Sequence, residues 1–290
     1  MLKKGDKIAL VAPSGWFSKS DLENALDWFK KQGLKTQIMS HAYDVEFYAA
    51  GTPQNRAKDI NDAFKDKSVK AIFCIRGGAG SLKVLDFLDF EMIKKNPKPV
   101  FGLSDSTALQ NALYTITKNV SYTGFLPIYD FKENHLDSKI ENSLFEIFNN
   151  KKQEIKEFEV LKKGEAEGVL IGGCLSVFNA LCGTKYFPKL KNKILLIEDV
   201  GEKTYRIDLM LDQLKKQKDF DKVKAIIFGS FLNCKIADIG DGTIDEIIKN
   251  FAKNLDIPVI YNFPYGHIKS RFILPIGKKI KLKTKSSITF

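Results

Sequence analysis

Short apolar runs alternate with amphipathic stretches from residue 7 to about residue 150. Runs of this kind, bounded by polar residues or glycine, are typical of buried strands. The expected strands are Lys7–Ala12, Lys35–Met39, Ala71–Ile75, Pro99–Gly102 and Ser121–Thr123. The expected helices are one opened by the capping box Ser20-Asp21-Leu22-Glu23 and closed by Gly33, then Asn55–Phe64, Ser81–Phe87 and Ser106–Thr117. This alternation predicts a parallel sheet covered by helices on both faces.

The pattern changes between residues 151 and 167, where charged and polar residues dominate. We therefore expect an N-terminal α/β domain over residues 1–150, a crossover over 151–167 and a C-terminal domain over 168–290. Beyond the crossover the pattern is mixed, which favours an α/β or α+β domain packed on the first. Its expected elements are the strands Ile194–Ile197, Ala225–Gly229 and Val259–Tyr261, the helices Thr204–Lys216 and Gly242–Ala252, and short strands in Phe272–Phe290.

Composition excludes several classes of protein. The chain has 290 residues, enough for one large or two moderate domains, and no apolar run long enough to span a membrane. The first apolar run is too short for a signal peptide and lacks a cleavage region, which predicts a cytoplasmic protein. The net charge is +11, but the lysines are scattered and form no basic stripe with interleaved aromatics. We expect no nucleic-acid partner, only a weak preference for anionic small substrates.

The cysteines and histidines argue against a metal centre. Cys74, Cys174, Cys182 and Cys234 show no C-x-x-C spacing, which favours buried free thiols over a disulfide or a zinc site. Only three histidines are available as further ligands. We expect neither a metal nor another cofactor.

The segment Gly102–Ser106 places a serine where an apolar strand meets a helix. In a tight turn of this kind the Oγ of Ser104 stands clear of the sheet beside a helix N-terminus, as in the nucleophile elbow of serine hydrolases. The alternative is that Ser104 or Ser106 only caps the helix. The segment alone supports both interpretations equally.

A serine nucleophile needs a base, and a histidine suits this role near neutral pH. His41 and His135 lie in polar, turn-like segments. His267 follows Gly266 and the buried strand Val259–Tyr261, at the carboxyl end where α/β proteins collect functional groups. The alternative for His267 is a loop histidine whose ring is satisfied by the backbone.

The base in turn needs an acid that fixes its tautomer. Glu198 is the best candidate, because it closes the apolar run Ile194–Ile197 and a carboxylate there is costly unless it is paired. Asp199 and Glu202 are local rivals, although Glu202 fits better in the loop before the next helix.

Two glycine-rich turns complete the candidate chemistry. The turn Arg76–Gly80 follows a strand and precedes a helix, so its amides can approach a substrate oxyanion. Phosphate binding is the rival interpretation, but the turn matches neither G-x-G-x-x-G nor a P-loop. The second turn, Gly172–Ser176, either lines the pocket from the other side or simply starts a helix.

Together these segments resemble the LD-carboxypeptidase family of serine peptidases, which includes murein tetrapeptide carboxypeptidases and microcin C immunity peptidases. The resemblance runs from about Lys4 to Lys283. The segments that carry it are Val11–Gly15, Tyr48–Thr52 with Arg56, Arg76–Gly78, Phe101–Asp105, Gly172–Ser176, Ile197–Asp199, Gly266-His267 and Leu274–Gly277. It implies an α/β fold with an N-terminal Rossmann-like parallel-sheet domain and a smaller, mixed and partly barrel-like C-terminal α/β domain, usually as a homodimer.

The resemblance also implies roles for particular residues. Ser104 would be the nucleophile, His267 the base and Glu198 the acid, in a site between the domains. The backbone near Gly78 and Asp105 would form the oxyanion hole. The candidates for substrate binding are Arg76, Gly77, Gly173 and Ser176, with Lys269 and Arg271 as further partners for carboxylates.

The implied reaction is hydrolysis of an L,D-peptide bond, which releases terminal D-alanine from a murein tetrapeptide during cell-wall recycling. One departure is Ala79, which stands where the family commonly has tyrosine in Arg-Gly-Gly-Tyr-Gly. A first alternative is a microcin C immunity-type peptidase acting on peptidyl or aminoacyl nucleotide analogues, for which only Tyr186 and Phe187 offer a stacking surface in 183–192. A second is a non-catalytic module that binds a small molecule.

Overall fold

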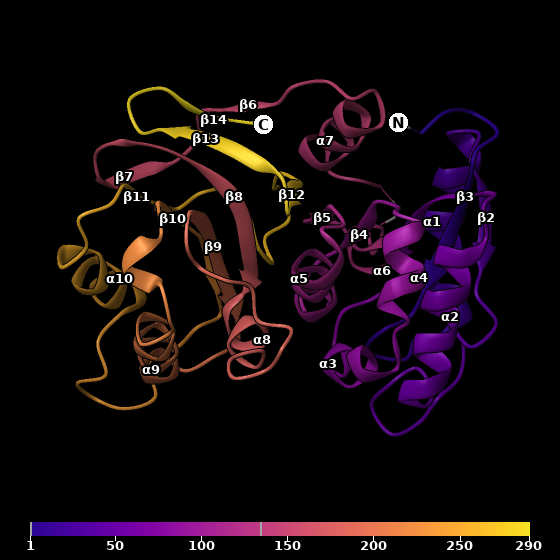
Figure 1. The fold of residues 1–290 in the computed structure, drawn as a ribbon, viewed down its shortest axis with the longest axis horizontal. Helices are drawn as coiled ribbons and strands as arrows, with labels where there is room; N and C mark the ends of the chain where they lie inside the picture. Colours follow the sequence, from indigo (N-terminus) through magenta and orange to yellow (C-terminus); the bar gives the residue numbers. More distant parts are fainter. Residues whose placement is uncertain (1, 134) are drawn as a thin grey trace.

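A computed structural model describes residues 2–133 and 135–290, and these residues form two mixed sheets side by side (Figure 1). The first sheet has five parallel strands and one antiparallel edge strand. In spatial order its strands are β12 (Leu274–Ile276), β5 (Ser121–Thr123), β4 (Val100–Gly102), β3 (Val69–Cys74), β1 (Lys7–Val11) and β2 (Lys35–Ile38). The predicted parallel sheet is confirmed.

Alternate residues of the central strands enter two different apolar cores. Ala9 and Ile72 pack on one face of the sheet with residues of α2 and α5, and Ile8 and Phe73 pack on the other with residues of α1 and α7. Helices therefore cover both faces, as the alternation along the chain predicts. The helices of this half are α1 (Lys19–Lys31), α2 (Pro53–Lys65), α3 (Ser81–Val84), the 3₁₀ helix η1 (Leu85–Phe87), α4 (Phe90–Lys95), α5 (Ser106–Thr117), α6 (Pro127–Asp130) and α7 (Ser138–Phe148).

The first helix begins earlier than predicted. The capping residue is Ser18, whose amide donates to the Asp21 carboxylate at 2.9 Å, so the expected box starting at Ser20 is wrong by two residues. Ser20 is likewise followed three residues later by an acidic residue, and sequence alone does not separate two overlapping candidates of this kind.

The second sheet has four parallel strands at its centre and antiparallel strands on both sides. In spatial order these are β6 (Glu154–Ile155), β14 (Ser287–Thr289), β13 (Lys279–Lys283), β8 (Glu165–Cys174), β9 (Lys193–Val200), β10 (Ala225–Leu232), β11 (Val259–Tyr261) and β7 (Glu159–Lys162). Within the described residues β6 and β7 are its two edges, so the barrel-like character that the resemblance implies does not extend to a closed barrel.

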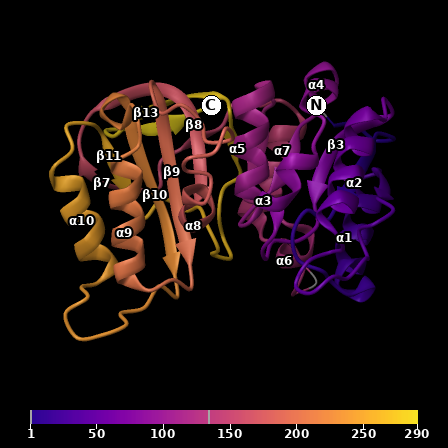
Figure 2. The same ribbon diagram turned by 60° about the horizontal axis from the view of Figure 1, so that its bottom comes forward.

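Helices α9 (Thr204–Lys215) and α10 (Ile244–Lys253) cover one side of this sheet (Figure 2). The short helix α8 (Leu175–Asn179) and the 3₁₀ helix η2 (Phe220–Lys222) complete this half. No helix in the part of the chain that the structure describes is long and apolar enough to cross a membrane.

The chain crosses between the sheets more often than a single linker implies. Residues 151–167, expected as a crossover, contribute β6, β7 and the start of β8 to the second sheet. The chain later returns to the first sheet as β12 and then continues into β13 of the second. The division into an N-terminal domain over residues 1–150 and a C-terminal domain over residues 168–290 stays a prediction.

Helix α5 holds the two halves together at the level of the candidate site. The Asn111 side chain pairs with the backbone of Gly172, accepting from its amide at 3.0 Å and donating to its carbonyl at 2.9 Å. Thr107 Oγ1 accepts from the amide of Cys174 at 3.1 Å. A Cβ on Gly173 would lie 2.6 Å from Thr107 Oγ1, so glycine is needed for this close approach.

Candidate active site

Ser104 sits on a strained turn between β4 and α5. Its φ is +66°, in the left-handed region that residues with a Cβ rarely adopt and that costs about 1–3 kcal/mol. Ser106 donates its hydroxyl back to the Leu103 carbonyl at 2.9 Å, and neither serine side chain caps the helix. The capping interpretation is therefore wrong for both. A half-buried serine in a strained strand–helix turn has the geometry of a nucleophile elbow.

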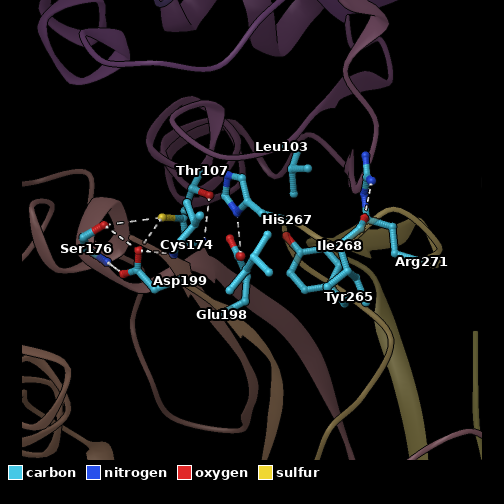
Figure 3. A network of polar contacts seen from close by, with 12 residues as sticks. Leu103, Thr107, Cys174, Ser176, Glu198, Asp199, Tyr265, His267, Ile268 and Arg271 are labelled. Carbon is cyan, nitrogen blue, oxygen red and sulfur yellow. Dashed lines mark hydrogen bonds and ion pairs between the residues drawn. The ribbon is translucent and has the colours of Figure 1, made fainter. Parts of the chain in front are cut away.

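His267 is paired with a fully buried carboxylate. Its Nδ1 lies 2.8 Å from Glu198 Oε2, and Glu198 has no exposed surface (Figure 3). Asp199 points to the opposite face of β9, where it accepts from the Ser176 amide at 2.8 Å. Glu202 binds Arg206 at 2.7 Å on the surface. Of the three acids that the sequence proposes, Glu198 alone pairs with the histidine in the described residues.

Two glycines make room for this pair. Gly266 has a φ of +118°, and a Cβ there would lie 2.7 Å from Glu198 Oε2 and 2.5 Å from Ser230 Oγ. On the other side, a Cβ on Gly229 would lie 2.5 Å from the Tyr265 carbonyl oxygen. Gly266 therefore approaches the carboxylate, and Gly229 approaches the Tyr265 carbonyl, more closely than any larger residue would allow.

Ser104 and His267 line one cleft of about 550 Å³. His267 comes from the loop after β11, whereas the remaining lining residues come from the first half of the chain. These are Ser20, Asp21, Asn24, Arg76, Gly77, Gly78, Ser104, Leu126, Ile128, Tyr129, Phe131 and Lys132. The cleft thus brings together Ser104, His267, Arg76, Gly77 and Gly78 from the residues singled out in the sequence.

The glycine turn is held beside the serine by buried polar side chains whose contacts sequence analysis did not predict. The Asp105 carboxylate accepts from the Ser81 amide at 2.8 Å and from Ser14 Oγ at 2.6 Å. Arg56, almost fully buried, donates to the carbonyls of Gly80 and Pro13. Burial raises the pKa of Asp105, and its hydrogen bonds and the Arg56 guanidinium oppose that rise. In the sequence, the only sign of these contacts is the charged residue Asp105 next to Ser104, and its residue type does not identify its hydrogen-bond partners.

The amides expected to form an oxyanion hole are without a hydrogen-bond acceptor in the part of the chain that the structure describes. Neither the Gly78 amide nor the Asp105 amide donates to an acceptor within residues 2–133 and 135–290. Gly78 has a φ of +110° and lines the cleft. A Cβ on Gly77 would lie 2.9 Å from Ser104 Cβ, so the turn can lie this close to the serine only as glycine.

The other predicted substrate-binding residues lie elsewhere. Gly173 packs against Thr107, and Ser176 is bound to Asp199, so neither lines the cleft. Arg271 is fully buried and binds Asp130, the Gly124 carbonyl and the Ile268 carbonyl, so its expected role as a partner for carboxylates of the substrate is wrong. Lys269 pairs with Glu133 on the surface.

Tyr129 is a further site residue without a sequence signal. Its hydroxyl donates to the His267 carbonyl at 2.7 Å, and its ring stands edge-on to the imidazole with centroids 6.3 Å apart. It is therefore placed to fix the loop that carries the base.

The described residues contain no group of three or more histidine, cysteine or acidic side chains arranged to hold a metal. All four cysteines are free, and Cys74 and Cys174 are buried. Burial raises the pKa of the Cys74 thiol to about 12, which keeps it protonated and unreactive at neutral pH.

Comparison with known proteins places this geometry in a family. A profile of the LD-carboxypeptidase N-terminal domain matches residues 8–124, and one of the LD-carboxypeptidase C-terminal domain matches residues 167–282. A putative carboxypeptidase of Bacillus subtilis is 33% identical over 316 residues, which cover 98% of this chain and 95% of that protein. The chain belongs to the LD-carboxypeptidase family.

Three further proteins are similar to this chain over most of its length. A probable murein peptide carboxypeptidase of Bacillus subtilis is 29% identical, over 98% of this chain and 90% of that protein. The structure of a muramoyltetrapeptide carboxypeptidase from Oxalobacter formigenes superposes with a TM-score of 0.89 at 29% identity, over 98% of this chain and 97% of that one. An MccF-like protein from Bacillus anthracis gives 0.86 at 30% identity, over 100% and 97%. As a member of this family, the chain is a peptidase.

Proposed function

We propose that this chain is a serine-type LD-carboxypeptidase that releases terminal D-alanine from murein tetrapeptides. Ser104 acts as nucleophile, His267 as base and Glu198 as the acid that orients the base. The observation that carries the proposal is the strained Ser104 turn facing the same cleft as the buried His267–Glu198 pair. The carboxypeptidase names of its relatives support the substrate class.

In the acylation step, Ser104 Oγ attacks the carbonyl carbon of the third stem-peptide residue. His267 Nε2 takes the hydroxyl proton, because Glu198 holds Nδ1 on the opposite side of the ring. The amides of Gly78 and Asp105 donate to the oxyanion that forms. The C–N bond then breaks, His267 returns the proton to the leaving amine, and D-alanine departs.

In the deacylation step, water attacks the ester carbon of the acyl-enzyme. His267 takes one proton from the water and gives it to Ser104 Oγ as the C–O bond breaks. The tripeptide leaves with a new carboxylate, and the free serine is restored. No step needs a metal or a redox cofactor.

The charges of the cleft fit an anionic peptide. Arg76 and Lys132 contribute positive charge, and Asp21 is the single acidic residue among the lining side chains. A tetrapeptide ends in a free D-alanine carboxylate, and a cationic cleft favours its approach. Ala79 is exposed within the glycine turn Arg76–Gly80 and leaves open the space that a tyrosine side chain would take in the family pattern.

The test is mass spectrometry of defined tetrapeptides incubated with the protein. We expect release of D-alanine from peptides that end in an L-Lys-D-Ala or diaminopimelyl-D-Ala bond, none from the all-L counterpart, and no effect of EDTA. Ser104→Ala is expected to abolish hydrolysis in a folded protein, by about four to six orders of magnitude. Equal cleavage of the all-L peptide refutes the stereochemical proposal, and loss of activity in EDTA refutes the metal-free mechanism.

A second candidate is cleavage of peptidyl or aminoacyl nucleotide analogues, which the MccF-like structural neighbour brings into consideration. The two aromatics that residues 183–192 offer for stacking a base are engaged in other contacts. The Tyr186 hydroxyl donates to Asp86 at 2.7 Å, and Phe187 packs against Phe178 with ring centroids 5.1 Å apart. An aminoacyl sulfamoyl nucleoside in the same assay separates the two: preferred cleavage of that compound would favour the second candidate.

The resemblance further supports a homodimer that acts in the cytoplasm on imported peptides. Light scattering on the purified protein tests the first part, and a mass of one chain, 32.8 kDa, would contradict it.

A further inference from the structure

The carboxylate behind His267 has one oxygen without a partner. Glu198 Oε2 binds the imidazole, whereas Glu198 Oε1 is buried and has no hydrogen bond within the described residues. An unsatisfied buried carboxylate oxygen costs free energy, and such atoms usually have a donor nearby.

Ser230 on β10 supplies a hydroxyl that also lacks a partner. Its Oγ is buried and makes no hydrogen bond within residues 2–133 and 135–290. Ser230 Oγ and Glu198 Oε2 lie 2.5 Å and 2.7 Å from the same point, the position that a Cβ on Gly266 would take. The Ser230 hydroxyl, a donor without an acceptor among the described residues, therefore lies near the Glu198 carboxylate, which has one oxygen without a donor there.

An irregularity of the sheet places the serine there. Phe228 pairs with Ile197 and Phe231 pairs with Asp199, so two residues of β10, Gly229 and Ser230, stand opposite the single residue Glu198 of β9. A bulge of this kind re-aims a side chain at the cost of one ladder position. The Ser230 amide donates to the Tyr265 carbonyl at 2.9 Å, which ties the bulge to the segment that carries His267.

We propose that the Ser230 hydroxyl donates to the Glu198 carboxylate, directly after rotation about its Cα–Cβ bond or through one buried water. Ser230 is then a positioning residue: it touches neither substrate nor nucleophile, and it holds Glu198 in the orientation that fixes the tautomer of His267. This inference rests on the proposed roles of Glu198 and His267.

The test compares two variants of the same shape, Ser230→Thr and Ser230→Val. Ser230 also lines a groove of about 630 Å³ at the carboxyl ends of β10 and β11, which has room for the extra methyl group. We expect the threonine variant to keep kcat within about twofold and the valine variant to lose about tenfold, the usual effect of one hydrogen bond, with KM unchanged in both. Equal kcat in the two variants overturns the proposal. Ser230→Ala, which only removes the oxygen, provides the same comparison if valine lowers Tm.

A second readout does not depend on peptidase activity. The proton on His267 Nδ1 is expected to give a downfield resonance in the proton NMR spectrum that His267→Ala removes. Ser230→Val should shift this resonance and Ser230→Thr should not; an unchanged resonance in both contradicts the inference. If no tetrapeptide is cleaved at all, the proposed function fails while this comparison still decides the role of Ser230.

Discussion

At the scale of single residues, the environment of each acid decides which one pairs with His267. Glu198 is buried and pairs with His267, whereas Glu202 forms an ion pair with Arg206 on the surface. We expect Glu198→Gln to lower kcat by about 10³-fold or more, because the amide no longer stabilises the imidazolium or its tautomer. Glu202→Gln, as the control, should change kcat by less than about twofold. The opposite ranking, measured by steady-state kinetics, would move the acid into the loop.

A second residue-scale prediction concerns Gly266. Alanine there is expected to lower both kcat and Tm, because its Cβ would meet Glu198 Oε2 at 2.7 Å and its φ is +118°. The strain alone costs about 1–3 kcal/mol. Gly201→Ala is the matched control, since Gly201 also has a positive φ, +72°, but nothing within 4 Å of the added carbon. An equal loss of kcat in both variants would contradict the role assigned to the close contact.

At the scale of elements, β9 connects the site to α8 through Asp199. Its carboxylate accepts from the amides of Ser176 and Val200, both at 2.8 Å, and burial raises its pKa. The folded state therefore takes up the proton at a higher pH than the unfolded state. Lowering the pH through the folded-state pKa favours folding, so this contribution to stability grows from neutral toward acidic pH.

Asp199→Asn removes this titration. We expect the free energy of unfolding of the unchanged protein, relative to that of the variant, to be greater at pH 5 than at pH 7. Urea unfolding at both values measures the difference. If this difference in free energy of unfolding is the same at both pH values, or smaller at pH 5, Asp199 does not bind a proton more readily in the folded state than in the unfolded state.

Sequence predicts best the strands and helices whose pattern of apolar residues lies within the element itself. The apolar runs of β1, β3 and β9 and the helical spacing of α5 were sufficient to place them. The segments β6 and β7 were missed because they are short, charge-rich edge strands whose pairing depends on distant partners, Thr289 and Tyr261 among them. The candidate site shows the same division. Ser104, Glu198 and His267 carry local signals, whereas only the fold brings Tyr129 to the His267 backbone and Ser230 near Glu198.

At the scale of the whole molecule, the first half of the chain is incomplete without the second. β12 covers the edge of β5, and buried Asp130 is paired with Arg271, which lies just before β12. A fragment of residues 1–150 is therefore expected to show no cooperative unfolding transition, because it exposes a bare strand edge and leaves a carboxylate unpaired. Circular dichroism during urea titration, beside the full chain, tests this. A sharp transition of the fragment would show that the half folds alone.

The excursion of β12 into the first sheet also limits how this protein can be recombined with its relatives. A chimera joined near residue 150 would take its first sheet from one parent, but the edge strand of that sheet, with Arg271, from the other. Exchanging complete structural units instead requires three junctions, so that Leu274–Ile276 travels with the N-terminal parent. The loop bearing His267 would then be joined to different parents at its two ends, which makes it the hardest segment of this peptidase to exchange.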